Sequence, residues 1–218
     1  MTPIDIEYKN TKLIKRGEAT FNSDFIDLAN WIDKTYDVKV LNINYDTITN
    51  NKKPRLQIIL EYESDSQKLS LMYGFGTSKQ LEISAPFINL ICERLTNYHT
   101  KNLWIVISSF ERPAKDEARW EISKKEIEQL ESELNLKELW KVHIGVCYGL
   151  TFFFFTNEQV LKFSTDVMKK ILTKKYFEIL KRHDEFGYHK ENDHLIQFES
   201  KENFIAYYDN SWFNYDRR

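Results

Sequence analysis

The longest apolar run of the chain is Lys141–Thr156, KVHIGVCYGLTFFFFT. Side chains of a strand alternate between its two faces, so the even and odd positions of this run describe different surfaces. Apolar or aromatic residues fill every even position: Val142, Ile144, Val146, Tyr148, Leu150, Phe152 and Phe154. This alternation favours one long, bent strand at the centre of a buried sheet. A hairpin that turns at Tyr148 and Gly149 is the alternative, because glycine accepts a positive φ.

The odd positions of the same run carry mostly small side chains. They begin at His143 and continue through Gly145, Cys147, Gly149 and Thr151. Small residues let another segment approach the backbone closely. Either a helix packs tightly on this face, or the face is the floor of a ligand pocket with His143 at its rim. The second interpretation makes His143, Gly145 and Gly149 candidate binding residues.

Length and composition predict a folded protein with a single domain over residues 1–218. The chain has 42% hydrophobic and 29% charged residues with only 6 Gly and 4 Pro, which argues against disorder and long linkers. The weakest place for a join between subdomains is residues 99–102. The polar N-terminus lacks the apolar core of a signal peptide, and Cys92 and Cys147 lie in apolar surroundings. Both features favour a cytoplasmic location with free thiols.

The pattern of helices and strands predicts an α+β fold, with a mixed, largely antiparallel sheet, an N-terminal α-βββ unit and helices packed on the sheet. Residues 1–20 are expected to form an extended arm. The other expected elements of the first half are a helix at 23–36, strands at 38–45, 56–62, 69–75 and 103–110, and a helix at 86–98 with Pro86 in its first turn.

Capping sequences mark the helices of the second half. Ser123 with Glu126, and Thr156 with Gln159, have the spacing of a capping box, in which each side chain accepts a hydrogen bond from the other residue's backbone. The remaining expected elements are a helix from Ser164 or Thr165 to His183, a strand at 194–198, a short helix capped by Ser200 and an edge strand at Trp212–Tyr215.

The densest group of ionisable residues lies between positions 183 and 194. Its candidate metal ligands are His183, His189, Asp193 and His194. Imidazole and carboxylate are the groups that zinc, iron or manganese require. The spacing matches no metal motif, so a hydrated turn between a helix and a strand is the favoured interpretation. Asp46, Glu61, Glu63 and Asp65, at neighbouring strand ends, are likewise interpreted as solvated carboxylates.

Two charged segments are candidate binding surfaces. Arg112 and Lys115 follow a buried strand directly, in the position where α/β sheets often place an anion site. An ordinary charged loop is the simpler interpretation. On the long helix, one line of residues lies roughly opposite the apolar face and suits an acidic partner or a stacked base: Lys170, Lys174, Phe177 and Lys181. Coverage of Phe177 by the C-terminal segment is the alternative.

The C-terminal segment is rich in aromatic residues, among them Trp212. Such a segment either closes the core or forms a recognition surface, and Trp212 is a candidate binding residue of that surface.

The sequence contains no phosphate-binding loop, nucleophile elbow or metal motif. We therefore expect a non-enzymatic intracellular module that binds another protein, in the manner of immunity or adaptor proteins, with no cofactor. With a net charge of −2, nucleic acid and membrane are not expected as partners. The alternatives are a protein that binds a small ligand over the small-residue face of 141–156, and a metal-dependent hydrolase or nuclease that uses the 183–194 cluster.

Overall fold

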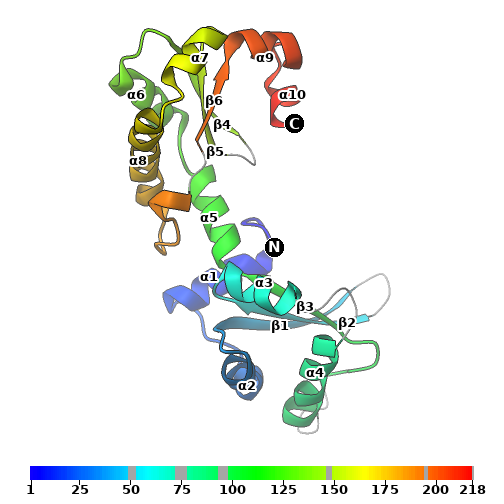
Figure 1. Cartoon of the computed structure of the whole chain (residues 1–218). Helices are drawn as coiled ribbons and strands as arrows, with labels where there is room; N and C mark the ends of the chain where they lie inside the picture. Colours follow the sequence, from blue (N-terminus) through cyan, green and yellow to red (C-terminus); the bar gives the residue numbers. More distant parts are fainter. Residues whose placement is uncertain (49–52, 72–77, 93–97, 146–148, 194–195, 218) are drawn as a thin grey trace. The chain divides into compact units, whose positions relative to one another are not determined.

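The computed structural model describes residues 1–48, 53–71, 78–92, 98–145, 149–193 and 196–217. Contacts divide the chain into two compact units, Met1–Asp116 and Glu117–Arg218, and each unit is built on its own mixed three-stranded sheet with helices (Figure 1). The predicted α+β class is confirmed. The single domain over residues 1–218 stays a prediction. Among the described residues, no helix has the length and apolar character needed to cross a membrane.

The first unit contains two helices ahead of its sheet. Its elements are α1 (Ile6–Arg16), the 3₁₀ helix η1 (Ser23–Phe25), α2 (Ile26–Tyr36), β1 (Val40–Ile48), β2 (Lys53–Leu60), α3 (Glu63–Leu71), α4 (Ser78–Phe87), the π-helical turn η2 (Ile88–Cys92), β3 (Trp104–Ser109) and α5 (Glu111–Trp120), which contains the boundary. The strand order is β1-β2-β3, with β1 antiparallel and β3 parallel to β2.

The two faces of this sheet differ in polarity. Ile43 pairs with Ile58, and their face packs against α2 and α4 in the main apolar core. Asn42 lies on the opposite face, which α1 covers (Figure 1). There the amide of Asn42 donates to the hydroxyl of Thr11 over 3.1 Å, and Arg55 pairs with Glu7 at 3.1 Å. The sheet therefore has one apolar face and one polar, helix-covered face.

The second unit begins with a capped helix and ends with two short ones. Its elements are α6 (Lys124–Leu134), β4 (Leu139–Gly145), β5 (Gly149–Phe154), α7 (Asn157–Phe163), α8 (Asp166–His183), η3 (Glu191–Asp193), β6 (Ile196–Ser200), α9 (Lys201–Tyr208) and α10 (Trp212–Asp216). The strand order is β4-β5-β6, again with one antiparallel and one parallel pairing. Both predicted capping boxes, at Ser123 and at Thr156, are confirmed.

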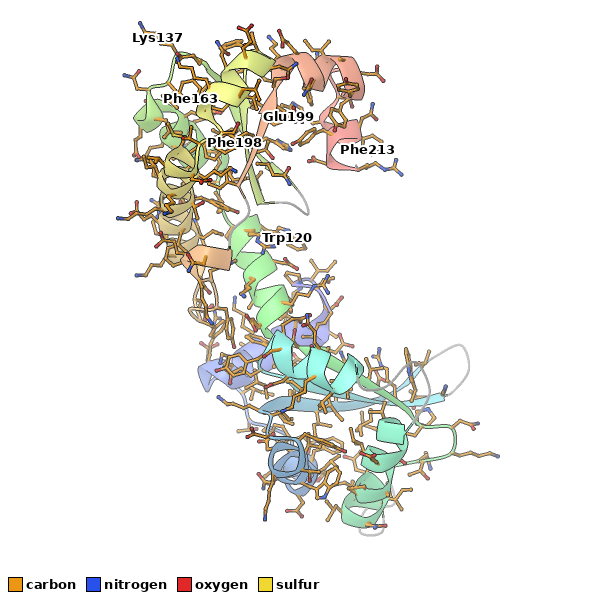
Figure 2. All side chains as sticks on the ribbon, viewed as in Figure 1. Trp120, Lys137, Phe163, Phe198, Glu199 and Phe213 are labelled. Carbon is orange, nitrogen blue, oxygen red and sulfur yellow. The ribbon has the colours of Figure 1, made fainter. Side chains whose placement is uncertain are left out.

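Both faces of the second sheet are apolar. One face packs against α6 and α8, and the ring of Phe154 stacks there on Phe163 and Phe198 (Figure 2). The other face is covered by α9 and α10, where Phe153, Phe204 and Tyr215 are buried together. Aromatic residues therefore cover the face that corresponds to the polar face of the first unit.

The two units share one topology. In each unit an α-helix ends in a left-handed cap residue, Asp37 or Asn135, and leads into an antiparallel hairpin. Each hairpin has a register shift near its start, between Val40 and Asn42 in the first unit and between Leu139 and Lys141 in the second. Helices then connect to a third strand that runs parallel to the second. The pairings make positions 42–45 of β1 equivalent to positions 141–144 of β4.

The run Lys141–Thr156 forms a hairpin, and the prediction of one long strand is wrong. Val142 pairs with Phe152, and Ile144 pairs with Leu150. Because the paired positions have an even sum, even residues of both strands face the same side, and alternation alone cannot distinguish a hairpin from one strand. Gly149, with φ of 79°, takes the left-handed conformation that glycine accepts.

Three other elements differ from the sequence predictions. The expected third strand, 69–75, overlaps the end of α3. The serines and carboxylates before it suit the first turn of a helix as well as a turn between strands. Residues 72–75 lie outside the described part. The expected arm at 1–20 contains α1, a mostly polar helix of which Tyr8 and Thr11 are buried. Pro86 lies in the last turn of α4.

The C-terminal segment is the last difference. The expected edge strand Trp212–Tyr215 is the helix α10, which Ser211 caps by accepting a hydrogen bond from the N–H of Asn214. Ser and Asn favour such caps, and the aromatic residues that suggested a strand lie on different sides of this short helix. Tyr215 is buried, whereas Phe213 is 66% exposed (Figure 2).

Candidate functional site

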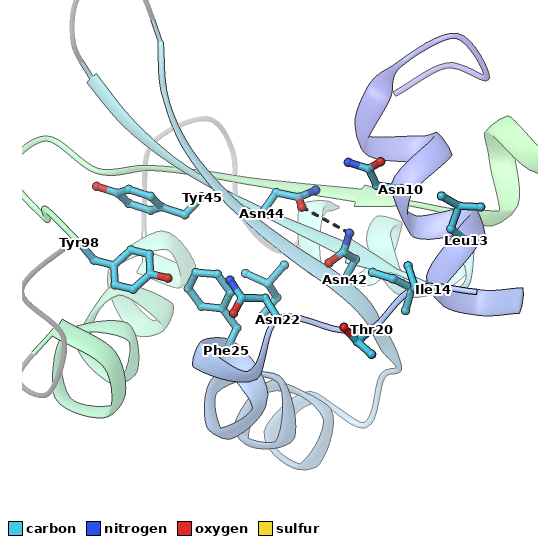
Figure 3. A pocket seen from close by; sticks show the side chains of 12 residues that line it. Asn10, Leu13, Ile14, Thr20, Asn22, Phe25, Asn42, Asn44, Tyr45 and Tyr98 are labelled. Atoms are coloured by element: carbon cyan, nitrogen blue, oxygen red, sulfur yellow. Dashed lines mark hydrogen bonds between the residues drawn. The ribbon is translucent and has the colours of Figure 1, made fainter. Parts of the chain in front are cut away.

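A pocket of about 350 Å³ lies in the first unit, between α1, η1 and the edge strand β1 (Figure 3). Three elements contribute to it, together with the linker after α1 and Tyr98 from the segment before β3. The lining residues are Asn10, Leu13, Ile14, Ala19, Thr20, Asn22, Phe25, Asn42, Ile43, Asn44, Tyr45 and Tyr98. None of these twelve side chains carries a charge, and four of them are asparagines. We refer to this cavity as the amide pocket.

The asparagines on β1 place amide groups along one wall. The amide nitrogen of Asn42 donates to Thr11 Oγ1 at 3.1 Å and to Asn44 Oδ1 at 3.3 Å (Figure 3). Asn42 is 3% exposed, so these bonds fix its orientation. Both hydrogens of this amide are engaged, so Asn42 can offer a ligand its acceptor oxygen, Oδ1.

Aromatic residues form the opposite end of the pocket. The rings of Tyr45 and Tyr98 meet edge to face, with centroids 5.0 Å apart, and Phe25 lies 5.3 Å from Tyr98. Burial and the hydrogen bond that Tyr98 donates to Asp24 Oδ2, at 2.6 Å, raise the pKa of Tyr98 to about 12. The hydroxyl of Tyr98 therefore stays protonated at physiological pH and is engaged by Asp24.

Two buried amide atoms next to the pocket have no hydrogen-bond partner among the described residues. They are Nδ2 of Asn44, a donor, and Oε1 of Gln57, an acceptor. Asn44 and Gln57 are direct partners across β1 and β2, so the two atoms belong to the same polar face of the sheet. A buried amide without a partner costs about 1–3 kcal/mol, so such groups usually meet water or a ligand.

The pocket runs along the free edge of β1. Among the described residues β1 pairs with β2 alone. In the second unit the equivalent edge, on β4, is occupied: the N–H of Val142 donates to Glu131 Oε1 at 2.6 Å. The matching side chain of the first unit, Asp33, instead accepts from the N–H of Val40 at 2.7 Å, at the start of the strand. Residues 42–45 of β1 therefore line the pocket.

The predicted residues of the small-sided face lie in the β4–β5 hairpin, where a helix covers them. His143 stacks on Trp212, with ring centroids 4.2 Å apart, and its Nε2 lies 2.9 Å from Asp216 Oδ1. Gly145 pairs with Gly149 at the end of the hairpin. Tight packing of a helix is thus the arrangement observed over His143, and a binding role for these residues stays a prediction.

Arg112 and Lys115 lie on the helix α5, and the expected loop at this position is wrong because the helix begins directly after β3. Lys115 pairs with Glu111 at 2.6 Å. Arg112 is exposed and lines a second cavity, of about 390 Å³, with Ser108 and Asp116. Lys115 is therefore paired along its helix, whereas Arg112 faces a cavity that both positive and negative side chains line.

The lysines predicted on the long helix lie on α8. Lys170, Lys174 and Lys181 are exposed, and Phe177 is half-buried. The opposite side of α8 is buried in the core through Leu172, Tyr176, Ile179 and Leu180. The helix thus has the two sides that its periodicity predicts, and docking of a partner on its outer side stays a prediction.

The residues of the expected metal cluster do not converge in the described part of the chain, where no group of metal-ligating side chains was found. His183 Nε2 lies 3.0 Å from Glu126 Oε1, and His189 is 5% exposed. Asp193 lies in η3, and His194 lies outside the described residues. His183 joins α8 to the capped start of α6, and the pKa of Glu126 is lowered to about 2 by the Ser123 N–H and by His183.

The asparagines of the amide pocket were not predicted from the sequence. Asn42 and Asn44 alternate with Ile43 and Tyr45, a signal for a strand with one polar face. Asn10 and Asn22, which complete the pocket, come from segments that carry no motif. Only the fold brings these residues together. Comparison with known protein families, with curated proteins and with solved structures found no match for this chain.

Proposed function

We propose that this protein is a binding protein and that the amide pocket holds an uncharged, hydrogen-bonding group of its ligand. The observation that carries the proposal is the unpartnered, buried amide nitrogen of Asn44 beside a cavity of about 350 Å³. The cavity volume lies at the small end of the range for ligand sites. The ligand group is therefore small, or it is part of a larger molecule.

The chemistry of the lining favours binding. Its amides offer donors and acceptors, and its apolar and aromatic residues offer contact area. Among the described residues, no carboxylate, imidazole or ammonium group lines it, and these are the groups that most often serve as general acids and bases. The proposal keeps the predicted binding module and moves its site from the charged surfaces to the edge of the first sheet.

The proposal includes a reducing, cytoplasmic setting, which suits the free thiol of Cys92. Burial raises the pKa of this thiol, and a protonated thiol reacts slowly. The other cysteine, Cys147, lies outside the described residues.

Titration of the ¹⁵N-labelled protein with neutral fragments tests the proposal. The probes are N-acetylated amino-acid amides, monosaccharides and nucleobases, and the readout is the side-chain amide resonances of Asn42 and Asn44. At least one class is expected to shift these resonances saturably. Asn44→Val should remove the effect, and Thr47→Val, an exposed site on the same strand outside the pocket, should preserve it.

Two results would reject the proposal. One is that none of the three neutral classes shifts the asparagine amides. The other is that acetate or guanidinium shifts them as strongly as the best neutral fragment, because an uncharged lining gives no reason for a charged ligand to bind equally well.

A further inference from the structure

We propose that the ligand of the amide pocket is an extended segment of another polypeptide, which adds to the free edge of β1 as a fourth strand. The inference rests on the proposed function and specifies its ligand. Addition of a strand to an exposed edge is an established mode of peptide recognition: backbone hydrogen bonds supply affinity, and alternate side chains supply specificity.

The first argument is the course of the pocket along the strand. Four consecutive residues of β1 line it, Asn42, Ile43, Asn44 and Tyr45. Consecutive residues of a strand point to opposite faces of the sheet. A cavity on one face would touch only alternate residues, so a cavity that touches all four lies along the edge itself. At a rise of about 3.3 Å per residue, this edge spans about 13 Å, the length of four residues of an added strand.

The second argument is the state of the backbone at that edge. Ile43 pairs with Ile58 in the same way that Val142 pairs with Phe152 in the second unit. The N–H of Val142 points outward, because it donates to the carboxylate of Glu131. By the same register, the N–H of Ile43 points toward the free edge of β1. Ile43 is only 1% exposed, so the residues that cover it have to move aside before an incoming strand can bond this N–H.

The third argument is the chemistry of the two walls. Asn42 and Asn44 lie toward Asn10 of α1 (Figure 3). Ile43 and Phe25 belong to the apolar core, and Tyr45 packs against it. An added strand presents its side chains alternately to these two walls. We therefore expect a bound segment in which small polar residues alternate with apolar ones. The lining carries no charge, so charged residues are expected only outside the central positions.

Selection from a displayed library of random 12-residue peptides, with the full-length protein as bait, tests this inference. Selected peptides should share the alternating pattern. Asn44→Lys, which places a charge in the pocket, should weaken their binding at least tenfold. Gln129→Lys is the matched control, because it makes the same change at an exposed amide on α6 and should leave binding unchanged.

N-methylation of the best peptide supplies a test that does not depend on the folding of a variant. In an added strand, alternate N–H groups of the peptide donate to β1. Methylation of one alternating set should weaken binding at least tenfold, and methylation of the other set should have little effect. Strand addition is rejected if no selected peptide is weakened by Asn44→Lys, or if both methylated forms bind like the parent. If the pocket binds neutral fragments but no peptide, the proposed function stands and strand addition is rejected.

Discussion

The two units of the chain have the same strand order, the same pairings and a register shift at the same place, yet they treat their edge strands differently. Glu131 accepts a hydrogen bond from the N–H of Val142 on β4, while Asp33 bonds the first residue of β1 and leaves residues 42–45 beside a pocket. The helix-covered faces also differ. In the second unit, aromatic residues of α9 and α10 fill this face, whereas in the first unit amides under α1 line it. Topology therefore sets where a site can be, and the side chains of the covering helices decide whether it is open.

The likeness between the units extends to individual hydrogen bonds. Ser109 donates to a carboxylate oxygen of Glu63, and Ser200 donates to Asn157 Oδ1. Each acceptor residue begins the helix after its hairpin, and its own N–H donates to a glutamate: Glu63 to Glu111 at 2.9 Å, and Asn157 to Glu202 at 2.8 Å. In both units this network joins the third strand to the helix that follows the second.

The largest expected effect contrasts the two covered faces. Phe153→Ala should lower the free energy of unfolding by about 3–5 kcal/mol, because the ring is fully buried between Trp140, Phe204 and Tyr215. Urea unfolding followed by circular dichroism measures it. Phe213→Ala, at an exposed ring, is the control and should change stability by less than about 0.5 kcal/mol. Equal effects of the two variants would contradict the aromatic core of the second unit.

An ionic cluster distinguishes the first unit from the second. Glu61 is 4% exposed and lies 2.5 Å from both Lys15 and Lys39; its equivalent in the second unit is Phe155, which is 41% exposed. Burial alone would raise the pKa of Glu61, but hydrogen bonds from the two lysines hold it below its usual value. Glu61→Gln should cost about 2–3 kcal/mol at pH 7, the magnitude for hydrogen bonds to a charged group.

The stability cost of Glu61→Gln should depend on pH, because the pKa of Glu61 is lowered in the folded state. A carboxylate with a depressed pKa stabilises the folded state above its unfolded pKa, near 4.5, and the contribution is lost as the pH falls through the folded value. The difference between Glu61→Gln and the unmodified protein should therefore shrink below pH 4.5. A difference that stays constant from pH 7 to pH 3 would show that Glu61 acts through packing rather than charge.

The shared serine network predicts the smallest of these effects, of similar size in the two units. Ser109→Ala and Ser200→Ala should each cost about 1–2 kcal/mol, because Ser109 bonds a carboxylate and Ser200 both donates to Asn157 and accepts the N–H of Asn203 as the N-cap of α9. Unfolding in urea of both variants, and of the double variant, gives the comparison. A cost at one serine and none at the other would break the equivalence of the two networks.

Local signals in the sequence predicted more of this structure than non-local ones. The capping boxes at Ser123 and Thr156 were predicted correctly because their partners lie three residues apart. The hairpin in 141–156 was missed because its paired positions keep the same parity, so alternation carries no information on the turn. The amide pocket was missed because α1, the linker after it and β1 meet only after folding, and an isolated asparagine has no pattern that marks it.

Amide hydrogen exchange, followed by NMR with and without the selected peptide, tests the central claim most directly. If the segment adds to β1, exchange of the Ile43 and Tyr45 amides should slow at least tenfold on binding, because their N–H groups gain partners. The Val142 amide, already bonded to Glu131, should not change and serves as the internal reference. Unchanged exchange at Ile43 and Tyr45 in the bound state, or equal slowing at Val142, would contradict the addition of a strand at β1.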